Sequence, residues 1–81
     1  MIKIEFNIED NKSVAYDENN IVGICEFLQK EKVWNIVHTE VNKNYQGQGI
    51  ARKLVECIIR EADKNNKKLI ADCSYAAKII K

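Results

Sequence analysis

The stretch Asn44-Tyr45-Gln46-Gly47-Gln48-Gly49-Ile50-Ala51 decides the fold, because the hydrophobic period changes across it. Before it, apolar residues alternate with polar ones, which is typical of β-strands. After it, apolar residues recur every three or four positions, at Ile50, Leu54, Val55, Ile58, Ile59 and Ala62. That spacing predicts an amphipathic helix. The stretch therefore joins a strand to a helix through a turn that contains two glycines.

The segments before this turn predict four strands, at residues 2–8, 13–16, 21–29 and 33–41. Short polar runs rich in Asn and Asp separate them, and Asn tolerates the positive φ that tight hairpins need. Consecutive strands joined by such short turns form an antiparallel meander.

The segments after the turn predict a strand-helix-strand unit and a short terminal helix. The long helix ends near Asn65 and Asn66, which favour a left-handed stop. Residues 68–72 predict a fifth strand, and Ser74 is placed to cap a helix over residues 75–80. A helical crossover makes the fourth and fifth strands parallel. The fold class is therefore α/β (α+β): a meander followed by β-α-β-α, in one domain over residues 1–81.

Composition and charge narrow the function classes. Apolar residues make up 46% and charged residues 31%, and these globular values argue against disorder. The net charge is +1, so no nucleic-acid partner is expected. No apolar run approaches the ~20 residues of a membrane span. The alternating N-terminus also lacks the apolar stretch of a signal peptide, so we expect a cytoplasmic protein with no membrane partner.

The cysteines, Cys25, Cys57 and Cys73, predict neither a metal centre nor a disulfide framework. They are odd in number and form no CxxC pair, and His38 is the only histidine. We interpret Cys25 and Cys57 as small buried hydrophobic residues.

The glycine turn is also the strongest functional signal. Gly47 and Gly49 let the backbone approach a ligand closely. The helix behind them presents unpaired N–H groups and a partial positive charge, which suit a phosphate or pyrophosphate. The turn fits neither GxGxxG nor the Walker pattern GxxxxGK[ST]. A glycine-rich connection that binds nothing remains the alternative.

Three motifs resemble the GCN5-related N-acetyltransferase family. Gln46-x-x-Gly49-x-Ala51 is similar to its Q/R-x-x-G-x-G/A signature, which binds the pyrophosphate of coenzyme A. His38-Thr39-Glu40-Val41 and Asp72-Cys73-Ser74-Tyr75 are similar to marks of the family's very short subgroup, an HT-x-V strand and a cysteine after the fifth strand. The resemblance implies a minimal form of the family's fold, in which the fourth and fifth strands are splayed.

The resemblance implies acetyl-CoA as the cofactor, and it assigns two groups of residues to it. Thr39, Glu40 and Val41 stand where the family's fourth strand lines the pantetheine arm. The expected phosphate contacts are Gln46, Gly47, Gln48, Gly49, Ile50, Ala51 and Arg52. Arg52 fits a solvated helix face equally well.

The chain departs from full-length relatives where they bind the acceptor. Residues 10–12 leave no room for the helices that relatives carry between the first two strands, and two C-terminal strands are not present. Asn35 stands where some histone-modifying members have a glutamate base, and an amide cannot serve as one near neutral pH.

Three side chains are candidates for catalysis. Cys73 precedes a helix whose N-terminus can lower its pKa, although a strand-end core residue is the alternative. Tyr75 lies near the place where larger relatives keep a tyrosine acid. His38 has an ordinary pKa near neutrality, but it alternates with Thr39 and so faces away from it.

Three function classes follow from these observations. The first is an enzyme that transfers acetyl from acetyl-CoA to an amine on a small molecule or a protein. The second is a non-catalytic module that binds CoA or acyl-CoA, and the third is an interaction protein whose turn binds nothing. We expect a monomer or a weak homodimer. Titration with CoA separates the third class from the others, and turnover with amines separates the first from the second.

Overall fold

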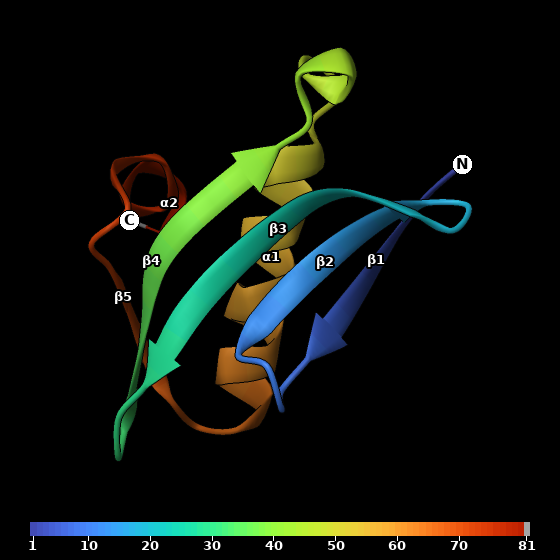
Figure 1. Cartoon of the computed structure of the whole chain (residues 1–81). Coiled ribbons are helices and arrows are strands. Elements are labelled where there is room, and N and C mark those ends of the chain that lie inside the picture. The colour runs from blue at the N-terminus through green and yellow to red at the C-terminus, as the bar shows by residue number, and fades with distance from the viewer. Residues whose placement is uncertain (81) are drawn as a thin grey trace.

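The computed structural model describes residues 1–80, which form a five-stranded mixed sheet with a long helix across one face (Figure 1). The elements are β1 (Ile2–Asn7), β2 (Lys12–Asp17), β3 (Asn20–Gln29), β4 (Val33–Val41), the 3-10 turn η1 (Lys43–Tyr45), α1 (Ile50–Lys64), β5 (Lys68–Ala71) and α2 (Ser74–Ile80). The strands lie side by side in chain order. The first four are antiparallel and β5 runs parallel to β4, which confirms the predicted fold class.

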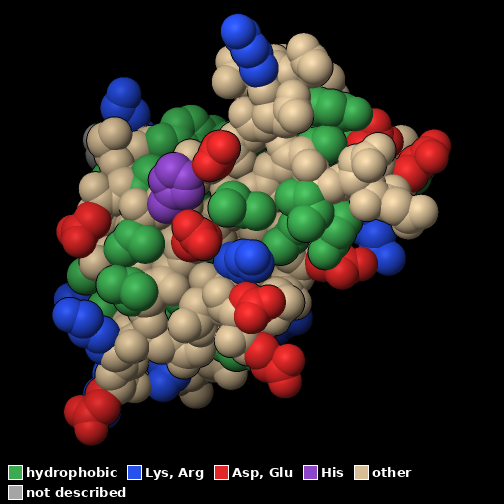
Figure 2. Space-filling view, in the orientation of Figure 1, with side chains coloured by type: hydrophobic (Ala, Val, Ile, Leu, Met, Phe, Trp, Pro, Cys, Tyr) green, Lys and Arg blue, Asp and Glu red, His purple; other side chains and the backbone are tan. Residues whose placement is uncertain are grey.

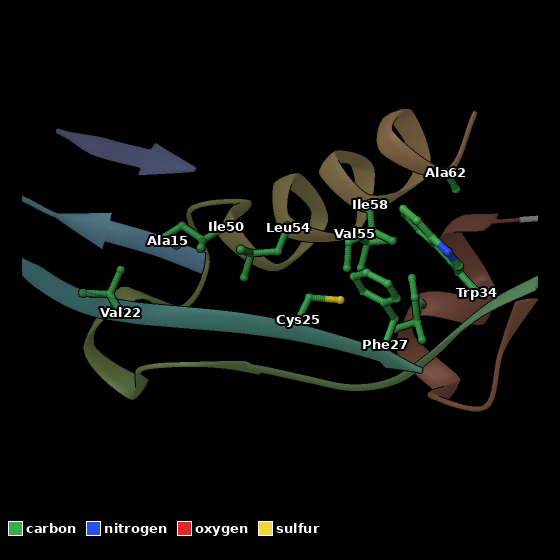
Figure 3. Close-up of a cluster of buried hydrophobic side chains, with 12 residues drawn as sticks. Ala15, Val22, Cys25, Phe27, Trp34, Ile50, Leu54, Val55, Ile58 and Ala62 are labelled. Atoms are coloured by element: carbon green, nitrogen blue, oxygen red, sulfur yellow. The ribbon is translucent and has the colours of Figure 1, made fainter. Parts of the chain in front are cut away.

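Helix α1 forms the core with the face of the sheet that it crosses. Its buried residues are Ile50, Leu54, Val55, Cys57, Ile58 and Ala62, so the predicted stripe is confirmed except that Ile59 is half-buried. All of them except Cys57 belong to one hydrophobic cluster with Phe27, Trp34 and Ile36 of the sheet. Figure 3 shows Phe27 and Trp34 on the side of the sheet that faces this helix. The rings of Phe27 and Trp34 stack with centroids 4.6 Å apart.

Neither helix in residues 1–80 covers the opposite face of the sheet (Figure 1). Figure 2 shows this open face, where the single histidine lies beside carboxylates.

Neither helix in residues 1–80 has the length and apolar character needed to cross a membrane.

One residue of β4 is extra in the pairing with β3. Glu26 pairs with His38 and Phe27 pairs with Ile36, so Val37 has no partner of its own. An extra residue of this kind is a β-bulge, and it changes which alternate side chains face each side of the sheet. Trp34 precedes the bulge on the α1 face, whereas His38 follows it on the open face.

The strands β4 and β5 separate after Ile36. The pairing runs only from Val33 to Ile36 of β4. At its end the Ile36 carbonyl oxygen accepts hydrogen bonds from the backbone N–H groups of Asp72 and Cys73, at 3.0 and 3.1 Å. The rest of β4 has no described strand on this side, which is the opening predicted between the fourth and fifth strands.

The Asn35 side chain closes this end of the pairing. Its Nδ2 donates to Asp72 Oδ2 at 3.0 Å, and its Oδ1 accepts from the Asp72 backbone N–H at 3.0 Å. The asparagine that cannot act as a base therefore connects the two strands.

Several predicted boundaries differ from the structure by one residue, and two of these differences change how a residue is interpreted. β1 ends at Asn7, and Ile8 is exposed in the turn that follows. α2 begins at Ser74, so the prediction that Ser74 caps this helix is wrong. The capping position belongs to Cys73, because the Ala77 backbone N–H already donates to the Cys73 carbonyl oxygen at 3.0 Å.

Candidate functional site

A groove of about 540 Å³ lies beside β4, beyond the point where β5 ends. Its walls come from β4, the turn before α1, the first residues of α1, and α2. The lining residues are Thr39, Val41, Tyr45, Gln46, Gly47, Gly49, Ile50, Ala51 and Tyr75.

The glycine turn forms one end of the groove. Gly47 has φ +84° and Gly49 has φ +77°, a left-handed conformation that glycine adopts at little cost. A Cβ placed on either glycine would meet no atom within 4 Å. The backbone conformation and the open space beside it thus both leave the main chain accessible to a ligand.

The N-terminus of α1 is open to an anion. Gly49 occupies the capping position and has no side chain to satisfy the first N–H groups. The first turn also contains no acidic residue. Because these N–H groups and the helix dipole both favour negative charge, this end of the groove suits a phosphate.

The structure brings together seven of the ten residues predicted to hold the cofactor. These seven lining residues are Thr39, Val41, Gln46, Gly47, Gly49, Ile50 and Ala51. Of the remaining three, Glu40 faces the open side of the sheet and Gln48 is exposed outside the lining. Arg52 Nε lies 3.2 Å from Glu56 Oε2 in an exposed ion pair, so its contact with a phosphate stays a prediction.

Cys73 follows β5 and is not itself a lining residue of the groove, but it lies next to the lining residue Thr39. Its Sγ is 3.6 Å from Thr39 Oγ1, and the side chain is partly exposed. Burial raises the pKa of Cys73, but hydrogen bonds from the Ala76 N–H, the Thr39 hydroxyl and the Tyr75 N–H together lower this pKa below the ordinary value. The sulfur thus caps the first turn of α2, and this turn favours the thiolate.

The other two cysteines differ from Cys73. Both are buried, as predicted. Burial raises the pKa of Cys25 to about 11, and burial also raises the pKa of Cys57. Both therefore keep their protons at neutral pH, where Cys73 is the thiol most readily ionised.

The remaining catalytic candidates lie on different faces of the sheet. Tyr75 lines the groove and is partly exposed. His38 is on the open face, where its Nε2 lies 3.0 Å from Glu40 Oε1. The structure thus places Tyr75 on the groove wall and Cys73 beside the wall residue Thr39, and it leaves His38 on the other face of the sheet. The catalytic roles of all three stay predictions.

Tyr45 is a groove residue that the sequence analysis does not single out. Its hydroxyl donates to Asp17 Oδ2 at 2.7 Å, which fixes the ring against the end of β2. This hydrogen bond raises the pKa of Tyr45 and lowers the pKa of Asp17. The available signal was an aromatic residue directly before Gln46, but its partner is distant in the sequence.

Metal ligation finds no support in the described part of the chain. In residues 1–80, no three His, Cys, Asp or Glu side chains are grouped so that they could hold a metal ion.

Solved structures with this fold include several acetyltransferases. A GCN5-like protein from Staphylococcus aureus, proposed to be an N-acetyltransferase, is 32% identical with a TM-score of 0.73, and the match covers 96% of this chain and 76% of that one. A ribosomal-protein-alanine N-acetyltransferase from Brucella melitensis is 20% identical with a TM-score of 0.70, over 84% of this chain. This chain spans only 55% of that enzyme's length, and the likeness shows the fold alone.

A third structure, a protein of unknown function from meticillin-resistant Staphylococcus aureus, is 19% identical with a TM-score of 0.71 over 95% of this chain and 83% of its own. No curated protein matches the chain significantly. The sequence model described as GCN5-related N-acetyl-transferase matches residues 5–81, which is nearly the whole chain. With the signature turn on the wall of the groove and the family's fold around it, the chain belongs to the GCN5-related N-acetyltransferase family.

Proposed function

We propose that this protein binds acetyl-CoA in the groove and transfers the acetyl group to an amine. The observation that carries the proposal is the glycine turn at the uncapped N-terminus of α1, which opens onto the unpaired half of β4. Membership of the family supports the same cofactor and reaction class.

The residues present fit the phosphate end of acetyl-CoA. Gly47 and Gly49 leave the main chain accessible, and the first N–H groups of α1 supply hydrogen-bond donors with partial positive charge. Substituting either glycine would place a Cβ in this open space. The pyrophosphate is the part of the cofactor that these features suit best.

The unpaired half of β4 fits the pantetheine arm. Beyond Ile36 the edge of β4 has no described neighbour on the groove side, so its backbone N–H and C=O groups remain available. An amide-containing chain can bond to such an edge as a further strand would. Thr39 and Val41 add side-chain contacts on the groove wall.

The end of the groove away from the glycine turn fits the acetyl group. When bound, acetyl-CoA supplies an activated acetyl thioester. Transfer to an amine forms a C–N bond and breaks the C–S bond, so the amine must lose a proton and the departing sulfur must gain one. Tyr75 lines the groove, and in this proposal its phenol gives that proton. Two roles fit Cys73, a nucleophile that receives the acetyl group first or a polar neighbour of the thioester.

One observation favours the alternative of a non-catalytic acyl-CoA-binding module. The groove lining contains no carboxylate and no imidazole that could accept the amine proton. Asn35 stands where some family members have a glutamate base, and its side chain is hydrogen-bonded to Asp72. A base role for His38 would require the acceptor to approach from the open face of the sheet.

The decisive experiment is an NMR titration with acetyl-CoA followed by turnover assays. We expect backbone amide shifts at residues 46–52, and little change at residues 2–8 of the opposite edge. A ligand that binds only the folded state also raises the unfolding free energy, by ~2.7 kcal/mol at a hundredfold excess over its dissociation constant. If millimolar acetyl-CoA changes neither the amides nor the melting temperature, the proposal is wrong.

Turnover with a panel of small-molecule and peptide amines separates the enzyme from the binding module. We expect Cys73→Ala to keep CoA affinity within about threefold and to lose transfer, because Cys73 contacts Thr39 at the acetyl end rather than the turn. Full transfer by Cys73→Ala would leave direct attack by the amine as the mechanism.

A further inference from the structure

Thr39 lies between two sulfur atoms. Its Oγ1 is 3.4 Å from Cys25 Sγ and 3.6 Å from Cys73 Sγ. Cys25 is the partner of Thr39 across the pairing of β3 and β4, and Cys73 approaches from the other side, after β5. Two strands and the segment after β5 therefore contribute to a chain of two hydrogen bonds that runs from the core to the edge of the groove.

The direction of this chain follows from the number of protons. With Cys73 protonated, its Sγ donates to Thr39 Oγ1. A Cys73 thiolate can only accept, and the single Thr39 hydroxyl proton can serve only one of the two sulfurs. Cys25 is fully buried and keeps its proton, since its pKa is raised to about 11. The Cys25 thiol is thus available as a donor to Thr39 Oγ1, and when Cys73 ionises the Thr39 proton is left for its thiolate.

We propose that Cys25 is a positioning residue, whose buried thiol donates to Thr39 Oγ1 and so directs the Thr39 hydroxyl proton to the sulfur of Cys73. A thiolate at Cys73 accepts a hydrogen bond from this hydroxyl. Such a charge-assisted hydrogen bond is stronger than a hydrogen bond between two neutral groups. Because Cys25 is outside the groove lining, it acts only through Thr39. The relevance to catalysis rests on the proposed function, whereas the effect on Cys73 does not.

Few other groups face the Cys73 sulfur. The backbone N–H groups of Tyr75 and Ala76 come from α2, and Thr39 comes from β4. The Asp72 carboxylate precedes it in the chain and is bonded to Asn35. No charged side chain is among the causes that shift the pKa of Cys73. The Thr39 hydroxyl is therefore the one side-chain donor whose removal tests the chain directly.

The test is the pH profile of Cys73 alkylation by iodoacetamide, followed peptide by peptide with mass spectrometry. Thr39→Val removes the hydroxyl and keeps the shape, and Thr39→Ser keeps the hydroxyl. Cys25→Val removes the buried donor, and Cys25→Ser replaces the thiol with a hydroxyl donor. Cys57→Ala removes a buried thiol from α1 and serves as the control.

We expect Thr39→Val to slow alkylation of Cys73 at pH 7 by about threefold or more and to move its pH profile upward, because the thiolate is the reactive form. Cys25→Val should move it in the same direction by about twofold. Thr39→Ser, Cys25→Ser and Cys57→Ala should keep the profile of the parent protein. Each variant is compared at a temperature where its melting curve shows it folded.

Two results would overturn the proposal. An unchanged profile in folded Thr39→Val would show that the hydroxyl does not serve Cys73. Equal shifts in Cys25→Val and Cys25→Ser would show that Cys25 acts by packing. Acetyl-CoA binding is measured separately on the parent protein. Absence of binding would contradict the proposed function. The alkylation result would still decide the role of Cys25.

Discussion

The two halves of β4 differ although they belong to one strand. Trp34, Asn35 and Ile36 pair with strands on both sides, and all three are buried. Residues 38–41 pair with β3 alone, and their side chains alternate between half-buried and exposed. The first half serves the core, whereas the second half lines the groove. Val37, the unpaired residue between them, marks the change.

The difference between the two halves of β4 shows how one strand of a small domain can contribute both to the hydrophobic core and to the groove. A chain of this size buries only about 60–65% of the surface that its unfolded form exposes, so few residues can be taken from packing. Here β5 is only four residues long, and it stops where the packing around Trp34 ends. Beyond that point, Thr39 and Val41 of β4 line the groove.

The largest expected effect is in the first half of β4. Trp34 is 1% exposed and stacks between aromatic rings, so Trp34→Ala should lower the unfolding free energy by ~3–5 kcal/mol. A chain of this length has roughly 4–12 kcal/mol in total, so the loss removes about a quarter or more of it, and the midpoint of urea unfolding should fall strongly.

Trp34→Phe is the matched control. It keeps a stacked ring and removes the buried Nε1, which has no hydrogen-bond partner in the structure. Its loss should be much smaller, under about 2 kcal/mol. A similar loss in both variants would show that the aromatic stack is not what stabilises this half.

The second effect concerns Cys25, which supports the second half of β4 from the adjacent strand. Its pKa in the folded protein, about 11, lies above that of an unfolded thiol. The folded state thus keeps a proton that the unfolded state loses, and its stability should fall as pH rises toward 11. We expect a loss on the order of 2 kcal/mol, seen as a falling melting temperature.

Cys25→Ser should flatten this alkaline decline, and what remains should come from Cys57 and Tyr45, whose pKa values are also raised. An equally steep decline in Cys25→Ser would mean that Cys25 does not titrate in this range.

The third effect concerns the turn that the second half of β4 leads into. Gly49→Ala should weaken acetyl-CoA binding at least tenfold, about 1.4 kcal/mol, measured by calorimetry. The added Cβ meets no protein atom but occupies the space proposed for the phosphates. Its positive φ also costs ~1–2 kcal/mol of stability.

Asn66→Ala controls for that strain. Asn66 has φ +56° at the other end of α1, so the substitution strains the backbone without approaching the groove. If Asn66→Ala weakens binding as much as Gly49→Ala does, the loss reflects stability and not the turn.

The smallest effect is expected on the open face of the second half of β4. His38→Gln breaks an exposed contact with Glu40 and should change the unfolding free energy by less than about 0.5 kcal/mol. Acetyl-CoA affinity should stay within about twofold, because the side chain points away from the groove. A large loss of affinity would show that the two faces of β4 are coupled.

The sequence predicted the features that depend on local pattern. Alternation predicted the strands, the period of Leu54 and Ile58 predicted α1, and Gly47 and Gly49 predicted the turn. These signals lie within a few residues of each other, so they can be recognised without knowing what packs against them.

The missed features depend on partners that are distant in the sequence. Strict alternation would put His38 on the core face with Trp34 and Ile36, but the bulge at Val37 turns it outward. Register against β3 decides this, and register is not visible in β4 alone. The contact of Tyr45 with Asp17 spans 28 positions and has no local signal.

The bulge at Val37 has a consequence for insertions and deletions. Loss of this single codon would place Ile36 directly before His38, and their β3 partners Phe27 and Glu26 are already neighbours. Regular alternation would then keep His38 and Glu40 on the open face, and Thr39 and Val41 on the groove side. The opposite arrangement would arise if Val37 stayed in place and the bulge were lost, because every later side chain of β4 would then change faces. Alignments of relatives can therefore place a one-residue gap at Val37 without altering the groove wall.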